Sequence, residues 1–227
     1  MVLCVSGNVT FQRAIELTEK WFGDLAPRAS HKRNLPSEPE QLEPRVLKVH
    51  SDVPEDMIVR IYHMCGANDP DFVASDLVSD VLANGPSARF HRNVLMTTDL
   101  FTDLDAVILG SDDPGLLYVT ARLADGVDAD EALDVIDGEI NKLLREGVSE
   151  RELRRYANQH VSRELYENIL YDVVAEKLCK YELLGDASRI NTENDEYQAV
   201  TVEQFNQVAQ KIFRPENCST LYYGPRW

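Results

Sequence analysis

The chain has 227 residues, 44% of them hydrophobic, which suffices for the packed core of one large domain or two small ones. Its 39 acidic and 23 basic residues give a formal net charge of −16, which argues against nucleic acid and anionic membranes as partners because both would be repelled. No run of about 18 apolar residues is present, so no transmembrane helix is predicted.

The first residues predict a strand followed by a helix. Val2–Ser6 has the composition of a short buried strand, and no basic start or cleavage site indicates a signal peptide. Thr10 is placed to cap an amphipathic helix that Gly23 ends. A strand this close to Met1 suggests a preceding segment outside this sequence. The compartment therefore stays unknown, with the cytoplasm favoured for the chain as given and the periplasm open if a signal was removed.

A proline-rich segment separates this start from the rest. Residues 26–44 carry prolines among charged residues, which favours a surface linker. Residues 45–50 and 57–64 are rich in β-branched residues and flank a polar break, so they predict two strands paired as a hairpin. We expect residues 1–25 to form a junction strand and helix, 26–44 a linker and 45–227 one domain.

Three helix starts carry side chains or a proline suited to the first turn. Ser149 and Glu152 predict a capping box, in which each side chain accepts a hydrogen bond from the other's backbone N–H. Thr201 and Gln204 predict the same arrangement, with Gln204 reaching back. Pro70 suits the first position of a third helix.

The predicted elements describe an α+β fold. Strands at 100–109 and 116–123 are separated by a turn-forming segment and are expected to pair as an antiparallel hairpin. Sequence-adjacent strands and clustered helices predict two layers, a mixed or antiparallel sheet covered by helices, rather than a doubly wound parallel sheet. The remaining predicted elements are helices at 70–84, 87–96, 129–145, 150–166, 169–184 and 201–213 and a strand at 218–223.

Some polar residues have the spacing of metal ligands, but their context favours structural roles. His160 and Glu164 have the i, i+4 spacing of two metal ligands, but a third ligand and a general base are missing, so we interpret them as a solvent-exposed pair. Asp128 and Asp130 favour a helix N-terminus over a calcium loop, because that motif's glycine and final Glu are absent. The cysteines are far apart and predict buried thiols; they are Cys4, Cys65, Cys179 and Cys218.

Several short segments, spread over nearly the whole chain, follow one another in an order that resembles a known family. They are Val5–Thr10, Trp21–Asp24, Leu77–Gly85, Ser87–Phe90, Val148–Leu153, Val200–Glu203 and Pro215–Asn217. In this order they resemble the second, non-catalytic half of the pitrilysin and insulysin family of zinc peptidases, beginning at the junction between the halves. The chain is also similar in this respect to the mitochondrial processing peptidases.

The resemblance implies the two-layer fold of the mitochondrial processing peptidases, of LuxS-like metallohydrolases and of the core subunits of the cytochrome bc1 complex. It implies a zinc site in the other half, on a helix carrying His-x-x-Glu-His whose Glu activates a metal-bound water. No metal, cofactor or catalytic residue is expected in this chain, because no two of its histidines are four residues apart. The histidines are His31, His50, His63, His91 and His160.

Two positions depart from the pattern of active family members. The second half of such enzymes is expected to supply an Arg and, seven residues later, a Tyr that hold the substrate and stabilise the oxyanion. Aligning Ser87–Phe90 with the family segment that precedes them places these positions at Leu95 and Thr102. Leucine has no hydrogen-bond donor and threonine only a short hydroxyl. Arg92, three residues before Leu95, is the alternative cation on the same predicted helix.

Three functional hypotheses follow. In the first, the chain is the non-catalytic half of a zinc metalloendopeptidase, is inactive alone, and forms one wall of a clamshell around an extended peptide. Its partners are then a homologous zinc-binding half, on the same parent chain or a partner subunit, and a peptide. In the second, the protein has lost catalysis and is a scaffold or peptide-binding subunit resembling the bc1 core proteins, which Leu95 and Thr102 favour. The third is an unrelated acidic α+β binding module.

Overall fold

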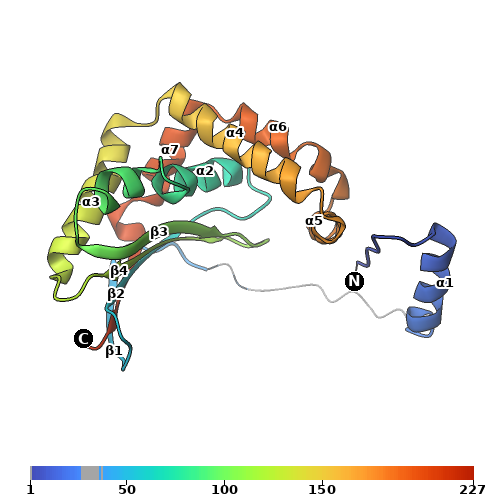
Figure 1. Ribbon diagram of the computed structural model, residues 1–227, viewed down its shortest axis with the longest axis horizontal. Helices are drawn as coiled ribbons and strands as arrows, with labels where there is room; N and C mark the ends of the chain where they lie inside the picture. Colours follow the sequence, from blue (N-terminus) through green and yellow to red (C-terminus); the bar gives the residue numbers. More distant parts are fainter. Residues whose placement is uncertain (1, 27–35, 37) are drawn as a thin grey trace. The chain divides into compact units, whose positions relative to one another are not determined.

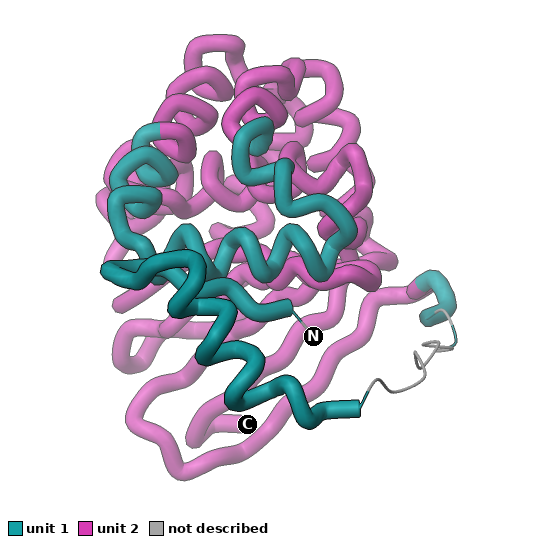
Figure 2. The backbone as a smooth tube through the Cα atoms, turned by 90° about the vertical axis from the view of Figure 1, so that its right-hand side faces the viewer, with its two compact units in different colours: residues 1–40, 162–193 teal, residues 41–161, 194–227 magenta. Residues whose placement is uncertain are grey.

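The computed structural model describes residues 2–26, 36 and 38–227, so most of the predicted linker and His31 lie outside the described residues. The chain divides into two compact units (Figure 2). The smaller comprises residues 1–40 and 162–193, and the larger comprises residues 41–161 and 194–227. The boundaries expected from the sequence, after residues 25 and 44, stay predictions.

The larger unit is built on a five-stranded mixed sheet. The strand order is β1-β5-β2-β4-β3, so the strand that is last in the chain lies between the first two. Side chains alternate between buried and accessible along β5, as expected for a strand with one face on the core. The strands are β1 (Arg45–His50), β2 (Met57–His63), β3 (Phe101–Leu109), β4 (Leu116–Leu123) and β5 (Cys218–Gly224).

The predicted hairpin between the first two strands is wrong. β5 pairs in parallel with β1, where Arg45 lies opposite Ser219, and antiparallel with β2, where Met57 lies opposite Tyr223. β1 and β2 both pair with β5, which lies between them. The short connection from β1 to β2 therefore crosses over β5 and is not a hairpin turn. A local sequence pattern cannot show that a distant strand enters between two neighbours.

The second predicted strand pair is confirmed. β3 and β4 are antiparallel, with Leu109 opposite Leu116 next to the turn. At the other end the register shifts, because Phe101 lies opposite Leu123 while Asp103 lies opposite Arg122. Thr102 is therefore the extra residue of a β-bulge in the edge strand.

Helices cover one face of this sheet (Figure 1). Their apolar residues recur at helical spacing: Ile136, Ile140 and Leu143 on α3 and Phe205 and Ile212 on α7 are all buried. They pack with Leu117 and other strand residues in one hydrophobic core. The covering helices are α2 (Phe72–Ala83), α3 (Ala129–Glu146) and α7 (Val202–Ile212). This confirms the predicted α+β fold of two layers.

The remaining elements are mostly short and include turns that the sequence did not indicate. The predicted helix at 87–96 is a turn followed by a π-helical segment, η1 (His91–Leu95). Two long helices, α4 (Glu150–Glu167) and α5 (Tyr171–Leu184), lie close to their predicted bounds. The other short elements are η2 (Ala187–Asn191), α6 (Glu193–Ala199) and η3 (Pro215–Asn217).

The smaller unit contains α1 (Phe11–Phe22), the end of α4, α5 and η2. Thr10 caps α1 as predicted, because its side-chain oxygen accepts a hydrogen bond from the Arg13 backbone N–H at 3.2 Å. The strand predicted at Val2–Ser6 is wrong, since these residues adopt no regular structure. A strand requires a partner for its backbone N–H and C=O groups, and none pairs with this segment among the described residues.

Among the described residues, no helix combines the length and the apolar composition that crossing a bilayer requires.

Candidate functional site

The two positions expected to hold the substrate-contacting Arg and Tyr carry no such groups in the structure. Leu95 ends the π-helical segment η1 and is partly buried against the hydrophobic core. Thr102 is exposed at the bulge that opens β3. A leucine packed on the core cannot donate a hydrogen bond, so an oxyanion would find no donor at this position.

The segment that carries Leu95 is tied to α3 by polar contacts. Asn93 donates from Nδ2 to Oε1 of the buried Glu139 at 2.7 Å. Arg92, next to it, is exposed, and its Nε donates to Oδ1 of Asn93 at 3.1 Å. Arg92 therefore stays exposed to solvent despite this contact.

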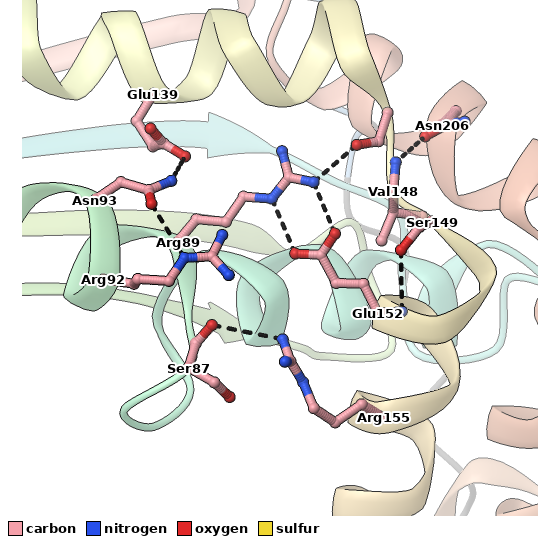
Figure 3. A network of polar contacts seen from close by, with 11 residues as sticks. Ser87, Arg89, Arg92, Asn93, Glu139, Val148, Ser149, Glu152, Arg155 and Asn206 are labelled. Atoms are coloured by element: carbon pink, nitrogen blue, oxygen red, sulfur yellow. Dashed lines mark hydrogen bonds and ion pairs between the residues drawn. The ribbon is translucent and has the colours of Figure 1, made fainter.

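Arg89, just before η1, joins this region to the start of α4 (Figure 3). Its guanidinium forms a bidentate pair with Glu152, with Nε to Oε1 at 3.1 Å and Nη2 to Oε2 at 2.8 Å. Nη2 also donates to the Gly147 carbonyl at 2.8 Å. The two side chains are only 7% and 15% exposed, so the pair is largely withdrawn from water.

Hydrogen bonds and a glycine fix the backbone of residues 147–149, just before α4, and so hold Glu152 in place. Ser149 caps the helix by accepting a hydrogen bond from the Glu152 N–H at 3.2 Å, and Val148 N–H donates to the Asn206 side chain. Gly147 has a φ of +69°, and a Cβ at this position would lie 2.8 Å from the Asn206 amide nitrogen, so glycine is required there. The predicted capping box is half formed, because the Glu152 carboxylate binds Arg89.

The second predicted capping box behaves in the same way. Thr201 caps α7, with its side-chain oxygen 3.1 Å from the Gln204 backbone nitrogen. Gln204 does not reach back to Thr201, since its Nε2 donates to the carbonyl of Pro70 at 3.2 Å. In both helices the third residue after the N-cap, Glu152 or Gln204, does not complete the capping box. Its side chain instead binds a segment that is distant in sequence.

The charge state of Glu152 follows from its neighbours. Burial acts to raise the pKa of this carboxyl. The hydrogen bonds and charge of Arg89, together with the charges of Arg155 and Arg92, outweigh burial and hold its pKa below the usual value. Glu152 is therefore ionised at neutral pH.

A surface pocket of about 580 Å³ opens beside this pair. Four arginines line it, and all four are exposed. Within the described residues, none of the four forms an ion pair. The hydrogen bonds that they donate go to neutral groups, namely from Arg92 to Asn93 and from Arg155 to the Ser87 carbonyl at 3.5 Å. They are Arg92, Arg151, Arg154 and Arg155, and we call this feature the arginine pocket.

The sequence indicated Arg92 only as a possible replacement for the missing cation at Leu95, and it did not indicate the arginine pocket. A signal was available, because Arg151, Arg154 and Arg155 are spaced i, i+3 and i+4 on the predicted helix at 150–166 and so must share one face. The contribution of Arg92 from a different element had no signal in the sequence.

A second pocket, of about 540 Å³, has Thr102 in its wall. Two of its charged residues are already engaged, since Arg226 pairs through Nε with the buried Asp56 and donates from Nη1 to the Val127 carbonyl at 2.6 Å. The wall also includes the acidic residues Glu55 and Asp125. We assign no chemistry to this pocket.

The interpretation of His160 and Glu164 as a solvent-exposed pair is wrong, because both side chains are buried. The His160 ring stacks on Tyr197, with ring centroids 3.4 Å apart, and Glu164 forms an ion pair with Lys177. The absence of a metal site stays a prediction.

The structure also shows the surroundings of Asp128 and of the four cysteines. Asp128 caps α3, accepting hydrogen bonds from the Asp130 and Glu131 N–H groups at 2.9 and 3.1 Å, which confirms a helix N-terminus instead of a calcium loop. The cysteines are free thiols, but only Cys218 is buried, and the others are half-buried. Burial raises the pKa of the Cys65 thiol, so it stays protonated at neutral pH.

The chain matches the model of a known protein family. The family described as the peptidase M16 inactive domain matches residues 1–160, well over half of the chain. No curated protein matches the chain in sequence.

Solved structures share the fold. A protease from Helicobacter pylori superposes with a TM-score of 0.87 at 21% identity, covering 96% of this chain and 53% of that one. A peptidase M16 inactive domain from Pseudomonas fluorescens gives 0.78 at 18% identity and covers 97% and 52%. A chain of complex III2 from Candida albicans gives 0.77 at 16% and covers 97% and 54%. The chain thus spans about half the length of these structures.

The family match and the shared fold confirm the resemblance to pitrilysin-like zinc peptidases that the ordered sequence segments indicated. The described residues also lack the substrate-binding Arg and Tyr at the expected positions, which carry Leu95 and Thr102. The chain belongs to the peptidase M16 family, as a domain of the inactive type.

Proposed function

We propose that this chain is the non-catalytic half of a zinc peptidase and forms one wall of a clamshell that holds an extended peptide. Its partner is a homologous half that carries the zinc, on the same parent chain or on a partner subunit. The chain alone does not hydrolyse peptides, and its role is to confine and position the substrate.

The observation that carries this proposal is the match to an inactive-type peptidase domain over residues 1–160. The coverage of the Helicobacter pylori protease supports it, because this chain accounts for 53% of that protein and leaves room for a second half of similar size. A zinc ion in that second half would polarise the scissile carbonyl and activate water.

Peptide hydrolysis tests the proposal. The chain is mixed or co-expressed with the zinc-binding half, and hydrolysis of a quenched fluorescent peptide is compared with that of each half alone in the presence of zinc. We expect turnover only in the combined sample. Hydrolysis by this chain alone would contradict the proposal, and equal hydrolysis by the zinc-binding half with and without this chain would contradict its accessory role.

A second candidate function is a scaffold or peptide-binding subunit without catalysis. The specific observation in its favour is Leu95, packed on the core where active members are expected to hold an arginine. Zinc bound by the other half together with no turnover in the combined sample would select this candidate.

Arg92 is the candidate to replace the missing substrate-contacting arginine if the combined sample is an active peptidase. If this arginine replaces the missing one at Leu95, Arg92→Gln lowers kcat of the combined sample about tenfold or more, with little change in KM, as for a lost oxyanion contact. An unchanged kcat would show that catalysis does not use Arg92.

A further inference from the structure

The arginine pocket stands out against the charge of the whole chain. The protein carries a formal net charge of −16, yet four arginines line one pocket of about 580 Å³. Cations gathered this closely repel one another, and each also draws in counter-ions from solution. An anionic ligand removes this repulsion, so the pocket favours binding of an anion.

The carboxylates nearest to the pocket offset its positive charge only in part, although the charge of Glu152 acts on Arg92 and Arg155. Glu152 lines the pocket, but both of its oxygens bind Arg89, a fifth arginine that does not line the pocket. Glu150 precedes Arg154 by four residues, a spacing that allows a pair on a helix, but no ion pair between them occurs among the described side chains. The four guanidinium groups therefore remain available to an external partner.

The pocket is built on supports that hold it in place. Ser149 caps the start of α4, and the bidentate pair between Arg89 and Glu152 fixes the first turn of that helix to the segment before η1. Arg151, Arg154 and Arg155 project from this fixed turn and the next one. Arg92 comes from η1, so two separate elements line the same pocket.

The location also connects the pocket with the peptide. Arg92 and Leu95 belong to the same five-residue segment, and Leu95 is the position that the family resemblance assigns to a substrate contact. Arg92, one of the four arginines of the pocket, therefore lies three residues before the position expected to contact the peptide.

We propose that the arginine pocket binds side-chain carboxylates of an acidic segment in the peptide that this domain holds, and so selects acidic peptides. This inference rests on the proposed function as a peptide-binding wall. The planar guanidinium groups suit carboxylates, with which they form two parallel hydrogen bonds. Because the chain as a whole repels acidic peptides, any such binding must come from a local site.

Binding of labelled peptides to the full 227-residue chain tests the inference. Fluorescence anisotropy compares a short peptide rich in Asp and Glu with the same peptide carrying Asn and Gln, both amidated at the C-terminus. We expect the acidic peptide to bind at least about fivefold more tightly, and the difference to shrink as salt rises. A neutral peptide with a free C-terminal carboxylate and inorganic phosphate serve as further probes.

The variants separate the pocket from general charge. Arg151→Gln with Arg154→Gln should lower the affinity for the acidic peptide about fivefold or more, because each exposed pair contributes modestly. Arg45→Gln with Arg145→Gln is the matched control, since both residues are exposed in the larger unit and the charge change is the same. This control should bind as the unchanged chain does.

Several outcomes would overturn the inference. Equal affinity for the acidic and neutral amidated peptides would remove the acidic preference while leaving the proposed function intact, because hydrolysis in the combined sample is measured independently. Equal binding of the neutral peptide with a free C-terminus would assign the pocket to a terminal carboxylate. Binding of inorganic phosphate alone, lost in the double variant, would assign it to a small anion.

Discussion

Glu152, in the first turn of α4, is expected to contribute strongly to the stability of the fold. It is the partner of Arg89, whose side chain is only 7% exposed. Replacing it by glutamine removes the charge but keeps the size, and leaves a guanidinium largely buried without its counter-charge. We expect Glu152→Gln to lower the free energy of unfolding by roughly 3 kcal/mol, measured by urea denaturation.

Glu150 offers a matched control for this change. It lies two residues earlier in the same helical turn and is exposed. Glu150→Gln should change the free energy of unfolding by less than about 0.5 kcal/mol. Equal effects of the two substitutions would show that the ion pair with Arg89 does not stabilise the fold.

The lowered pKa of Glu152 predicts how this contribution depends on pH. A carboxyl whose folded pKa lies below its unfolded value of about 4.3 stabilises the fold fully above that value and loses the effect as pH falls through the folded pKa. The stability difference between the unchanged chain and Glu152→Gln should therefore be constant near neutral pH and shrink below about pH 4. Urea denaturation across this range measures it, and a difference that persists at the lowest pH would refute the assignment.

At the level of single elements, α7 depends on its first residue. Thr201 accepts a hydrogen bond from the Gln204 N–H, and the helix presents Phe205 and Ile212 to the core. Thr201→Ala should cost about 1 kcal/mol in the free energy of unfolding, because a backbone donor loses its partner. Thr201→Ser keeps the oxygen and should stay close to the unchanged chain in thermal unfolding. A serine variant as unstable as the alanine one would point to packing of the methyl group instead.

Local patterns predicted these elements well where the determinants are themselves local. Thr10, Ser149 and Thr201 all cap the helices they were expected to cap, and the turn before Leu116 joins an antiparallel pair. The α+β class followed from the same signals. Helix caps and tight turns use residues within a few positions of each other, so the sequence shows them directly.

The errors concern partners far away in the chain. Glu152 and Gln204 have the spacing to complete capping boxes, but they bind Arg89 and the Pro70 carbonyl. Val2–Ser6 has a strand's composition but no strand beside it. The arginine pocket needs Arg92 from one element and three residues from another. The side chains are chemically able to form the contacts expected from the sequence. Which contacts they form depends on residues brought close by the tertiary fold, and local sequence patterns do not show these.

For the molecule as a whole, β5 is the strand on which the sheet depends. It lies between β1 and β2 and pairs with both, so its removal leaves two strands without a shared neighbour. A chain that stops at Asn217 should show no cooperative unfolding transition, because the sheet is divided and Tyr222 leaves the core. Circular dichroism during heating measures this.

Deletion at the other end gives the comparison. Removing residues 1–25 takes away α1, none of whose residues is buried, and leaves the larger unit complete. This variant should keep a cooperative transition. If the two deletions behave alike, β5 has no special importance for the sheet.

The position of β5 also affects how the protein is made. His63, at the end of β2, precedes the residue before β5 by 154 positions. At roughly 5–20 residues per second, a ribosome needs about 8–30 s to synthesise the intervening chain. During this time β1 and the edge of β2 that faces β5 lack their strand partner, and their unpaired backbone groups can join to other chains. The sheet is thus completed only after these 154 residues have followed β2.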